Sequence, residues 1–338
     1  MKNKFKKPYL IAEVGSSHMG NINLAFKAIA EAKKGGADCV KFQLFDESTI
    51  VHPKLKTLSY IKHNKYKYQS QRFARMKISL NTFKKLHSYA KKKKIDFCAT
   101  PFDPTFVKKI SRYVKFFKVA SGDLNFYPLL KELKKTKKII LISTGMSNYG
   151  DINRSIKYLN KNRVIILHCV SSYPTEKNNI NLKNILELKR YFNLPVGFSD
   201  HTSGIDAAVA SISYGAKIIE KHFIPSKGAN KSADYALSIN FKQMKFLKEK
   251  MQQADEMIGK KKDRVLKCEK YGEKNLKRSI YSIKNIKRGQ KINKDNIACL
   301  RPYMKRGIKV EDYFKILNKK AKREIKKLNL IKKEHVRK

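Results

Sequence analysis

Two kinds of polar residue recur where short apolar segments of this 338-residue chain end. Lys41 and Lys118 both lie within apolar runs, and a buried ammonium group without a partner is costly. An anionic ligand would neutralise the two lysines, and hydroxyl groups nearby would complete an oxyanion site. The hydroxyls at matching positions are those of Ser121, Ser143 and Ser199. These residues predict a site for a small phosphorylated anion, although either lysine alone could be a rim residue.

A pair of histidines suggests a second kind of chemistry. His201 and His222 end two consecutive apolar runs, so their imidazoles are expected to face one pocket. Two imidazoles suit a divalent metal that keeps open positions for water and substrate. The alternative is a pair of hydrogen-bonded core histidines, and the spacing by itself leaves both interpretations open.

Eight short apolar runs are expected to position these residues. They cover residues 9–14, 39–45, 96–102, 116–122, 139–145, 164–170, 195–201 and 217–223. Near-continuous apolar runs are typical of parallel strands buried on both faces. Amphipathic stretches lie between them, for example 21–34, 79–94 and 178–192.

Eight strands that alternate with helices over about 250 residues predict an α/β fold, the (β/α)8 or TIM barrel. In such a barrel the carboxyl ends of the strands form the active-site face. The alternative is a doubly wound open sheet, which usually has a glycine-rich phosphate turn after its first strand. Residues 15–20 lack that glycine spacing, so the barrel is favoured.

The domain organisation follows from the pattern beyond the strands. Residues 45–79 are too many for a simple turn and should form an excursion at the mouth of the barrel. A helix over 241–258 closes a barrel domain of residues 1–259. Residues 260–275 are charged and nearly free of apolar pattern, as in a linker. Residues 276–338 then read as a separate small β-rich module.

The charge of the chain is extreme. Lys and Arg number 77 against 27 Asp and Glu, a formal net charge of +50. A nucleic-acid partner, electrostatic steering of an anionic substrate and compositional bias are the three explanations. Lysine far outnumbers arginine and is spread along the chain, which favours compositional bias. No aromatic–glycine RNA signature, zinc finger or basic recognition helix accompanies the charge, so nucleic acid is not the expected partner.

The cysteines and the apolar stretches bear on the cellular compartment. The five cysteines include no Cys-x-x-Cys pair, which argues against a disulfide framework or a thiolate zinc site. No apolar stretch approaches the roughly 18 residues of a membrane span. The basic first residues precede a strand-length apolar segment rather than a signal-peptide core. We expect a soluble cytoplasmic protein with no membrane partner.

Six motifs, in order and with compatible spacing, resemble those of the sialic acid synthase family. They are IAE at 11–13, VKFQ at 40–43, FKVASGD at 117–123, STGM at 143–146, GFSDHT at 197–202 and EKHF at 220–223. The family includes N-acetylneuraminate, legionaminate and pseudaminate synthases. The resemblance covers nearly the whole chain, because residues 276–338 are similar to the family's antifreeze-like (SAF) domain. That name describes a fold and implies no ice binding.

The resemblance implies a reaction. Phosphoenolpyruvate condenses with the open-chain aldehyde of an N-acyl hexosamine, either N-acetylmannosamine or a related 2,4-diacetamido-trideoxyhexose. Water adds, phosphate leaves, and a nine-carbon 2-keto sugar acid forms. The resemblance also implies a divalent metal, with manganese expected first and magnesium or cobalt as alternatives.

The resemblance assigns roles by motif position. The residues expected to bind phosphoenolpyruvate are Lys41, Thr100, Lys118, Ser121, Ser143 and Ser199. The metal ligands are His201 and His222. The acid–base candidates are Glu13 and Asp123, and the sequence does not choose between them. The sugar-binding residues are Ser171, Tyr173, Asp234 and Arg301.

Some residues depart from the family pattern. Ser171 stands where N-acetylneuraminate synthases often have Asn, and the loop 225–234 lacks the Gly-Pro-Asp typical of that subgroup. Residues 232–234 look more like those of pseudaminate-type members, which leaves the sugar open. The resemblance further implies a domain-swapped homodimer in which Arg301 reaches the partner's site. A 3-deoxy sugar-phosphate synthase is a competing function, but those enzymes lack the SAF module.

Overall fold

The chain forms two compact units, Met1–Gly259 and Lys260–Lys338. The structure is a computed structural model, and it describes residues 5–58, 66–226, 228–229, 232–259 and 265–337. Among these residues, no helix is both long enough and apolar enough to cross a membrane.

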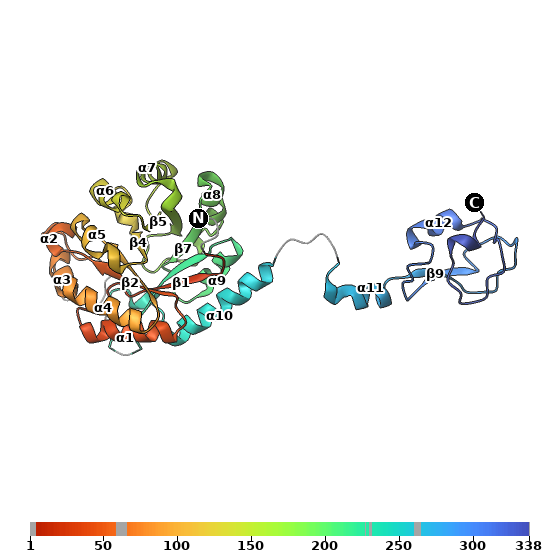
Figure 1. The fold of residues 1–338 in the computed structure, drawn as a ribbon, viewed down its shortest axis with the longest axis horizontal. Coiled ribbons are helices and arrows are strands. Elements are labelled where there is room, and N and C mark those ends of the chain that lie inside the picture. Colours follow the sequence, from red (N-terminus) through yellow and green to blue (C-terminus); the bar gives the residue numbers. More distant parts are fainter. Residues whose placement is uncertain (1–4, 59–65, 227, 230–231, 260–264, 338) are drawn as a thin grey trace. The chain divides into compact units, whose positions relative to one another are not determined.

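The first unit is built around a closed parallel barrel in which the strands follow one another in chain order (Figure 1). Its strands are β1 (Tyr9–Glu13), β2 (Cys39–Leu44), β3 (Asp96–Pro101), β4 (Phe116–Val119), β5 (Ile139–Ser143), β6 (Val164–Cys169), β7 (Val196–Asp200) and β8 (Ile218–His222). The barrel closes because Glu13 of β1 pairs with Lys41 on one side and His222 on the other. The predicted barrel is confirmed, and the open-sheet alternative is wrong.

Helices surround this barrel and cover the outer faces of its strands (Figure 1). They are α1 (Ile22–Lys34), α4 (Leu80–Lys92), α5 (Pro104–Ile110), α6 (Tyr127–Lys135), α7 (Tyr149–Leu159), α8 (Lys183–Phe192), α9 (Asp206–Ser213) and α10 (Phe241–Ile258). Local signals fix their starts: the Asn21 side chain accepts hydrogen bonds from the first backbone amides of α1, and Asp103 caps α5 before Pro104. The helix predicted from residue 178 begins later, at Lys183.

The barrel interior is apolar at its base and polar at its top. A buried cluster of Ile11, Cys39, Phe116, Leu141, Leu167 and Ile218, among others, fills the base. Side chains two residues apart on a strand face the same way. On each strand, the residue two positions after a member of this cluster therefore also faces the barrel interior, but lies nearer the carboxyl end of the strand. Those residues include Glu13, Lys41, Lys118, Ser143 and Glu220. The strand period therefore brings the polar residues together.

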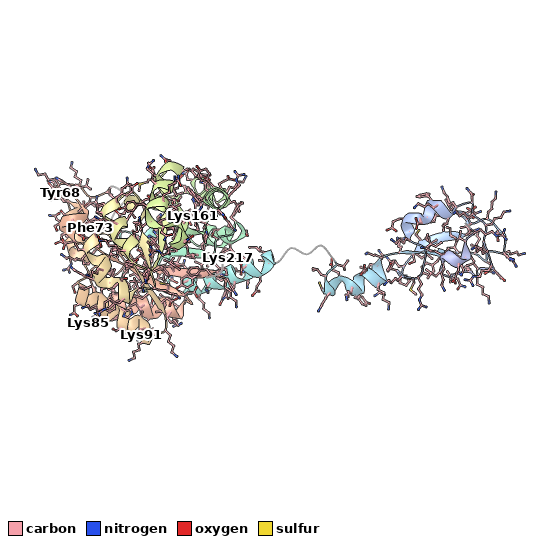
Figure 2. The ribbon with its side chains drawn as sticks, turned by 45° about the horizontal axis from the view of Figure 1, so that its top comes forward. Tyr68, Phe73, Lys85, Lys91, Lys161 and Lys217 are labelled. Carbon is pink, nitrogen blue, oxygen red and sulfur yellow. The ribbon has the colours of Figure 1, made fainter. Side chains whose placement is uncertain are left out.

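The excursion after β2 contains two short helices, α2 (Glu47–Ile50) and α3 (Gln69–Met76). Phe45 packs edge-on against Phe73, with ring centroids 5.0 Å apart, which holds α3 over the end of β2. Lysines on other elements, such as Lys85 and Lys91, lie exposed at the edge of the barrel unit (Figure 2), and Lys161 is exposed as well. Dispersed, solvated lysines of this kind agree with compositional bias as the source of the charge.

The second unit has a small core of its own. Strand β9 (Ser279–Ser282) pairs antiparallel with β10 (Ile297–Leu300), and α12 (Tyr313–Ile316) follows. The core consists mainly of isoleucines: Ile280, Ile286, Ile292, Ile297, Ile308, Ile316, Ile325 and Ile331.

The described part of the predicted linker, residues 265–275, contains helical structure. The structure places a 3-10 turn at Lys267–Glu269 and the helix α11 at Lys270–Leu276. Residues 260–264 of the predicted linker lie outside the described residues. Because α11 buries no residue, it has no apolar stripe from which the sequence could have predicted it.

Candidate active site

A cavity of about 420 Å³ opens at the carboxyl ends of the barrel strands. Most of the predicted site residues line it: Glu13, Lys41, Thr100, Lys118, Ser121, Ser143, Ser171, Tyr173, Ser199, His201, His222 and Asp234. Two predicted residues do not. Asp123 ends the 3-10 turn Ser121–Asp123, whose first two residues alone face the cavity, and Arg301 belongs to the second unit. The acid–base role expected for Asp123 is therefore not supported by contact with the cavity.

Lys41 is the centre of a buried ionic cluster. Its Nζ lies 2.7 Å from Glu13 Oε2 and 3.5 Å from Glu220 Oε2, and it donates a hydrogen bond to Thr100 Oγ1 at 3.0 Å. Burial by itself would lower the pKa of Lys41, but the two carboxylates outweigh that effect and raise it. Lys41 is therefore a permanent cation in the floor of the cavity.

Lys118 shares Glu220 with Lys41. Its Nζ lies 3.9 Å from Glu220 Oε1, and that oxygen also accepts a hydrogen bond from Ser199 Oγ at 2.9 Å. Burial opposes ionisation of Glu220, but the two lysines together lower its pKa to about 2. Burial conversely raises the pKa of Glu13, with Lys41 opposing. A proton on Glu13 would leave the cluster with a net positive charge, which suits an anionic ligand.

Hydroxyl groups and a glycine amide form the next part of the cavity wall. The backbone N–H of Gly145 donates a hydrogen bond to Ser121 Oγ at 3.1 Å, and a Cβ at position 145 would lie only 2.3 Å from Ser171 Oγ. The buried hydroxyls of Ser143 and Ser171 have no hydrogen-bond partner within the described parts of the chain. Of the three hydroxyls predicted for the oxyanion site, that of Ser143 has no such partner, whereas Ser199 Oγ donates to Glu220. Buried donors left without partners suit an oxyanion.

The two histidines also line the cavity, with ring centroids 5.4 Å apart. His201 Nδ1 lies 2.8 Å from the Val170 carbonyl oxygen, which fixes its proton there and leaves Nε2 with a lone pair. The Nδ1 of His222 is buried and without a hydrogen-bond partner among the described residues. Burial lowers the pKa of His222 to about 4, so its ring is neutral near pH 7, the state that a metal ligand needs.

The space beside His222 is open because residue 15 is glycine and has no side chain to fill it. Its φ is +48°, and a Cβ there would lie 3.2 Å from both Asp234 Oδ2 and Glu13 Oε1, and 3.5 Å from His222 Cε1. The unpartnered imidazole nitrogen, the second imidazole and the space beside them fit a divalent cation. Among the described residues, no group of three or more His, Cys, Asp or Glu side chains is arranged to hold a metal ion. A cation held by two histidines would keep its other positions for water and substrate.

The Gly15 space can be tested with a matched control. Gly15→Ala is expected to lower kcat/KM by about 10- to 100-fold, because a methyl group would push the carboxylates and His222 out of place. Gly204→Ala is the control, since Gly204 has φ +79° with nothing within 4 Å of its Cβ position. Both variants carry backbone strain of roughly 1–2 kcal/mol. If the two variants have equal activity in steady-state assays, the contacts of the added methyl group at position 15 do not affect the site.

Sequence reasoning missed several residues of the cavity. Gln43 Nε2 donates to Glu13 Oε1 at 2.7 Å, and Ser16 Oγ donates to Asp234 Oδ2 at 2.6 Å. Gln43 and Glu220 could have been assigned from the strand period, because each is two residues from an assigned residue on the same strand. Ser16 and Arg72 come from loops or from the excursion, where no periodicity predicts which side chains face the cavity.

Comparison with known proteins places the chain in a family. The model of the NeuB family matches residues 28–263, and that of the SAF domain matches residues 277–337. The chain belongs to the NeuB family. This confirms the resemblance to sialic acid synthases.

Three relatives of this NeuB-family chain are informative. It is 35% identical over 337 residues to the N,N'-diacetyllegionaminic acid synthase of Campylobacter jejuni, covering 96% of this chain and 99% of that protein. It is 30% identical to a pseudaminic acid synthase of the same organism, covering 96% and 95%. The crystal structure of an N-acetylneuraminic acid synthetase from Leptospira borgpetersenii, in complex with citrate, superposes with a TM-score of 0.70 at 28% identity, covering 79% of this chain and 90% of that one.

Proposed function

We propose that this NeuB-family protein condenses phosphoenolpyruvate with an N-acyl hexosamine and water, releasing phosphate and a nine-carbon 2-keto sugar acid. The observation that carries the proposal is one cavity with two unlike halves. Lys41, Lys118 and the serine hydroxyls form an oxyanion part, and the histidine pair lines the same cavity. The two Campylobacter jejuni relatives are synthases of acids of this kind.

The residues of the cavity suit the steps of this reaction. Lys118, Ser143 and Ser171 would hold the phosphate and carboxylate of phosphoenolpyruvate, so that its C3 faces the sugar aldehyde. C3 forms a bond to the aldehyde carbon as the C2=C3 double bond opens, and water adds at C2. One proton of the water ends on the aldehyde oxygen. The C2–O bond to phosphate then breaks, the second proton leaves with phosphate, and C2 becomes the ketone carbonyl. Glu13 is the acid–base candidate that lines the cavity, and Gln43 holds its carboxyl group in place.

A divalent metal is part of the proposal, with manganese first and magnesium or cobalt as alternatives. His201 and His222 would hold the metal, and when bound it would polarise the aldehyde. Removing metals with a chelator is expected to abolish turnover, and adding manganese is expected to restore it. Full turnover of protein shown by elemental analysis to be metal-free would refute this part of the proposal.

The rim of the cavity bears on the sugar. Ile50, Leu58, Phe73 and Met146 give it an apolar wall, and Arg72 is the only arginine among its described lining residues. An apolar wall suits the methyl groups of acetamido substituents and a 6-deoxy carbon, but not a sugar phosphate. We therefore favour a non-phosphorylated 2,4-diacetamido-trideoxyhexose over N-acetylmannosamine. The chain is 35% identical to the legionaminic acid synthase of Campylobacter jejuni and 30% identical to the pseudaminic acid synthase, and this difference in sequence identity favours the legionaminic type.

The test of the function is a sugar panel assayed with phosphoenolpyruvate. It contains N-acetylmannosamine, its 6-phosphate, and the 2,4-diacetamido-trideoxyhexoses that correspond to legionaminic and to pseudaminic acid. Phosphate release is measured, and the mass of the product is determined by mass spectrometry. We expect the legionaminic-type trideoxyhexose to react fastest, whereas no phosphate release with any sugar would overturn the proposed reaction.

The assembly and the compartment complete the proposal. We infer a domain-swapped homodimer in the cytoplasm, in which Arg301 of one chain binds the N-acyl group of the sugar in the partner's cavity. Arg301 directly follows β10 and is exposed within its own unit. Its planar guanidinium can hold a carbonyl oxygen in a partly desolvated pocket. No nucleic-acid partner is proposed.

A further inference from the structure

A buried ion pair lies outside the cavity and has no part in the chemistry described above. Lys221 Nζ lies 2.8 Å from Asp200 Oδ2, and both side chains are 0% exposed. Neither residue is among those that line the cavity. Asp200 and Lys221 are paired in the register of β7 and β8. By the strand period their side chains point away from the barrel interior, opposite to Ser199 and Glu220.

The pair is tied to the backbone on both sides of the candidate metal site. Lys221 Nζ also donates to the Thr202 carbonyl oxygen at 2.6 Å, and Asp200 Oδ1 accepts from the Thr202 amide at 2.8 Å. His201 is therefore enclosed between two residues that are both bonded to Lys221. His222 directly follows Lys221 on β8. One ammonium group thus connects the two chain segments that carry the histidines.

Stability alone does not account for such a pair. Removing two charges from water is costly, and well-packed apolar residues of similar volume often stabilise a fold as well or better. A fully hydrogen-bonded buried network does, however, hold its members in one geometry. After the last strand pairing of β7, the backbone of residues 201–202 is held by this network together with Thr175, which bridges to Thr202 and donates its amide to the His201 carbonyl oxygen at 2.9 Å. Thr175 lies on the β6 side, so the ion pair is the connection to β8.

We propose that the Asp200–Lys221 pair is a positioning pair, which sets the separation and orientation of the His201 and His222 imidazoles. This inference rests on the proposed function only in that the two histidines are taken as the metal ligands. Partners behind the ligands of a metal commonly change its affinity by about 10- to 100-fold when they are removed. The pair itself touches neither substrate nor metal.

The test removes both charges together, because removing one would leave the other buried and unpaired. Asp200→Leu/Lys221→Met is titrated with Mn²⁺ and followed by the electron paramagnetic resonance of the free ion. We expect a Kd for Mn²⁺ about 10- to 100-fold above that of the unaltered protein. The affinity for phosphoenolpyruvate, measured by calorimetry without metal, is expected to stay within about twofold, because the lysines that bind it are on other strands.

A second ion pair serves as the matched control. Lys248 Nζ lies 2.5 Å from Asp38 Oδ2, before the amino-terminal ends of β1 and β2 and thus at the other end of the barrel. Asp38→Leu/Lys248→Met removes an ion pair from the same unit without touching the histidine strands. Its Mn²⁺ affinity is expected to equal that of the unaltered protein, even if its melting temperature falls.

Two further measurements keep the inference falsifiable. If Asp200→Leu/Lys221→Met does not fold, Asp200→Asn/Lys221→Met keeps an acceptor for the Thr202 amide and takes its place. If the unaltered protein binds no Mn²⁺, the metal proposal fails, and the ring-nitrogen NMR shifts of His201 and His222 decide the positioning role. A folded double variant with unchanged Mn²⁺ affinity, or with unchanged ring-nitrogen shifts in that second case, would overturn the inference.

Discussion

Lys118→Met is expected to lower kcat/KM for phosphoenolpyruvate by about 100- to 1,000-fold, the usual effect of truncating one partner of a buried charge pair. The Lys118 ammonium group is 3% exposed and faces the cavity beside hydroxyls that have no partner among the described residues. Methionine keeps most of the volume of the side chain and removes only its charge. The loss is therefore expected in KM for phosphoenolpyruvate, with the KM for the sugar nearly unchanged.

Lys115→Met is the matched control for this variant. Lys115 lies three residues earlier on the chain, pairs with Asp96, and has a side chain that is 49% exposed. Surface ion pairs contribute little, so this variant should keep native kinetics. Phosphate-release rates and thermal unfolding are measured for both proteins. If Lys118→Met also keeps native kinetics while folded, Lys118 is a rim lysine that does not bind the substrate.

The strands of the barrel could be predicted because each is a nearly unbroken apolar run. All eight strands lie within the predicted segments, and α10 begins and ends at the predicted residues, where Asn240 caps its start. Elements without an apolar stripe could not be predicted. The helix α11 buries nothing, and α8 begins after a 3-10 turn whose polar residues resemble the start of a helix.

The site residues that lie on strands could be predicted, because the two-residue period of a strand determines which side chains face the barrel interior. Lys41 and Lys118 were expected to be neutralised by an anionic ligand, and the structure adds two counter-ions that the sequence did not predict, Glu13 and Glu220. Those pairings depend on which strands are neighbours and how they are staggered, which the spacing within one strand does not specify. Asp123 lies in a turn beyond β4, where the strand period does not apply. The sequence therefore could not predict that Asp123 is absent from the cavity lining.

Mixing two inactive variants is expected to restore activity if the active unit is the domain-swapped homodimer. An Arg301→Ala chain keeps an intact barrel, and a Lys118→Met chain keeps an intact second unit. In a mixed dimer, the barrel that retains Lys118 would receive Arg301 from its partner. Random pairing makes half of the dimers mixed, with one complete site each, so about one quarter of the native activity should return.

The control separates exchange between chains from any general effect of mixing. Lys41→Met mixed with Lys118→Met places both defects in the barrel, so no mixed dimer has a complete site, and activity should stay at the level of the separate variants. The mixtures are refolded together, and the mixed dimers are verified by native mass spectrometry before the assay. In the domain-swapped dimer, the guanidinium that binds the N-acyl group of the sugar would come from the second chain, so that the sugar could be bound fully only after the dimer has formed. If verified mixed dimers of Arg301→Ala and Lys118→Met stay inactive, Arg301 acts within its own chain or not at all, and the sugar must be held by the barrel residues alone.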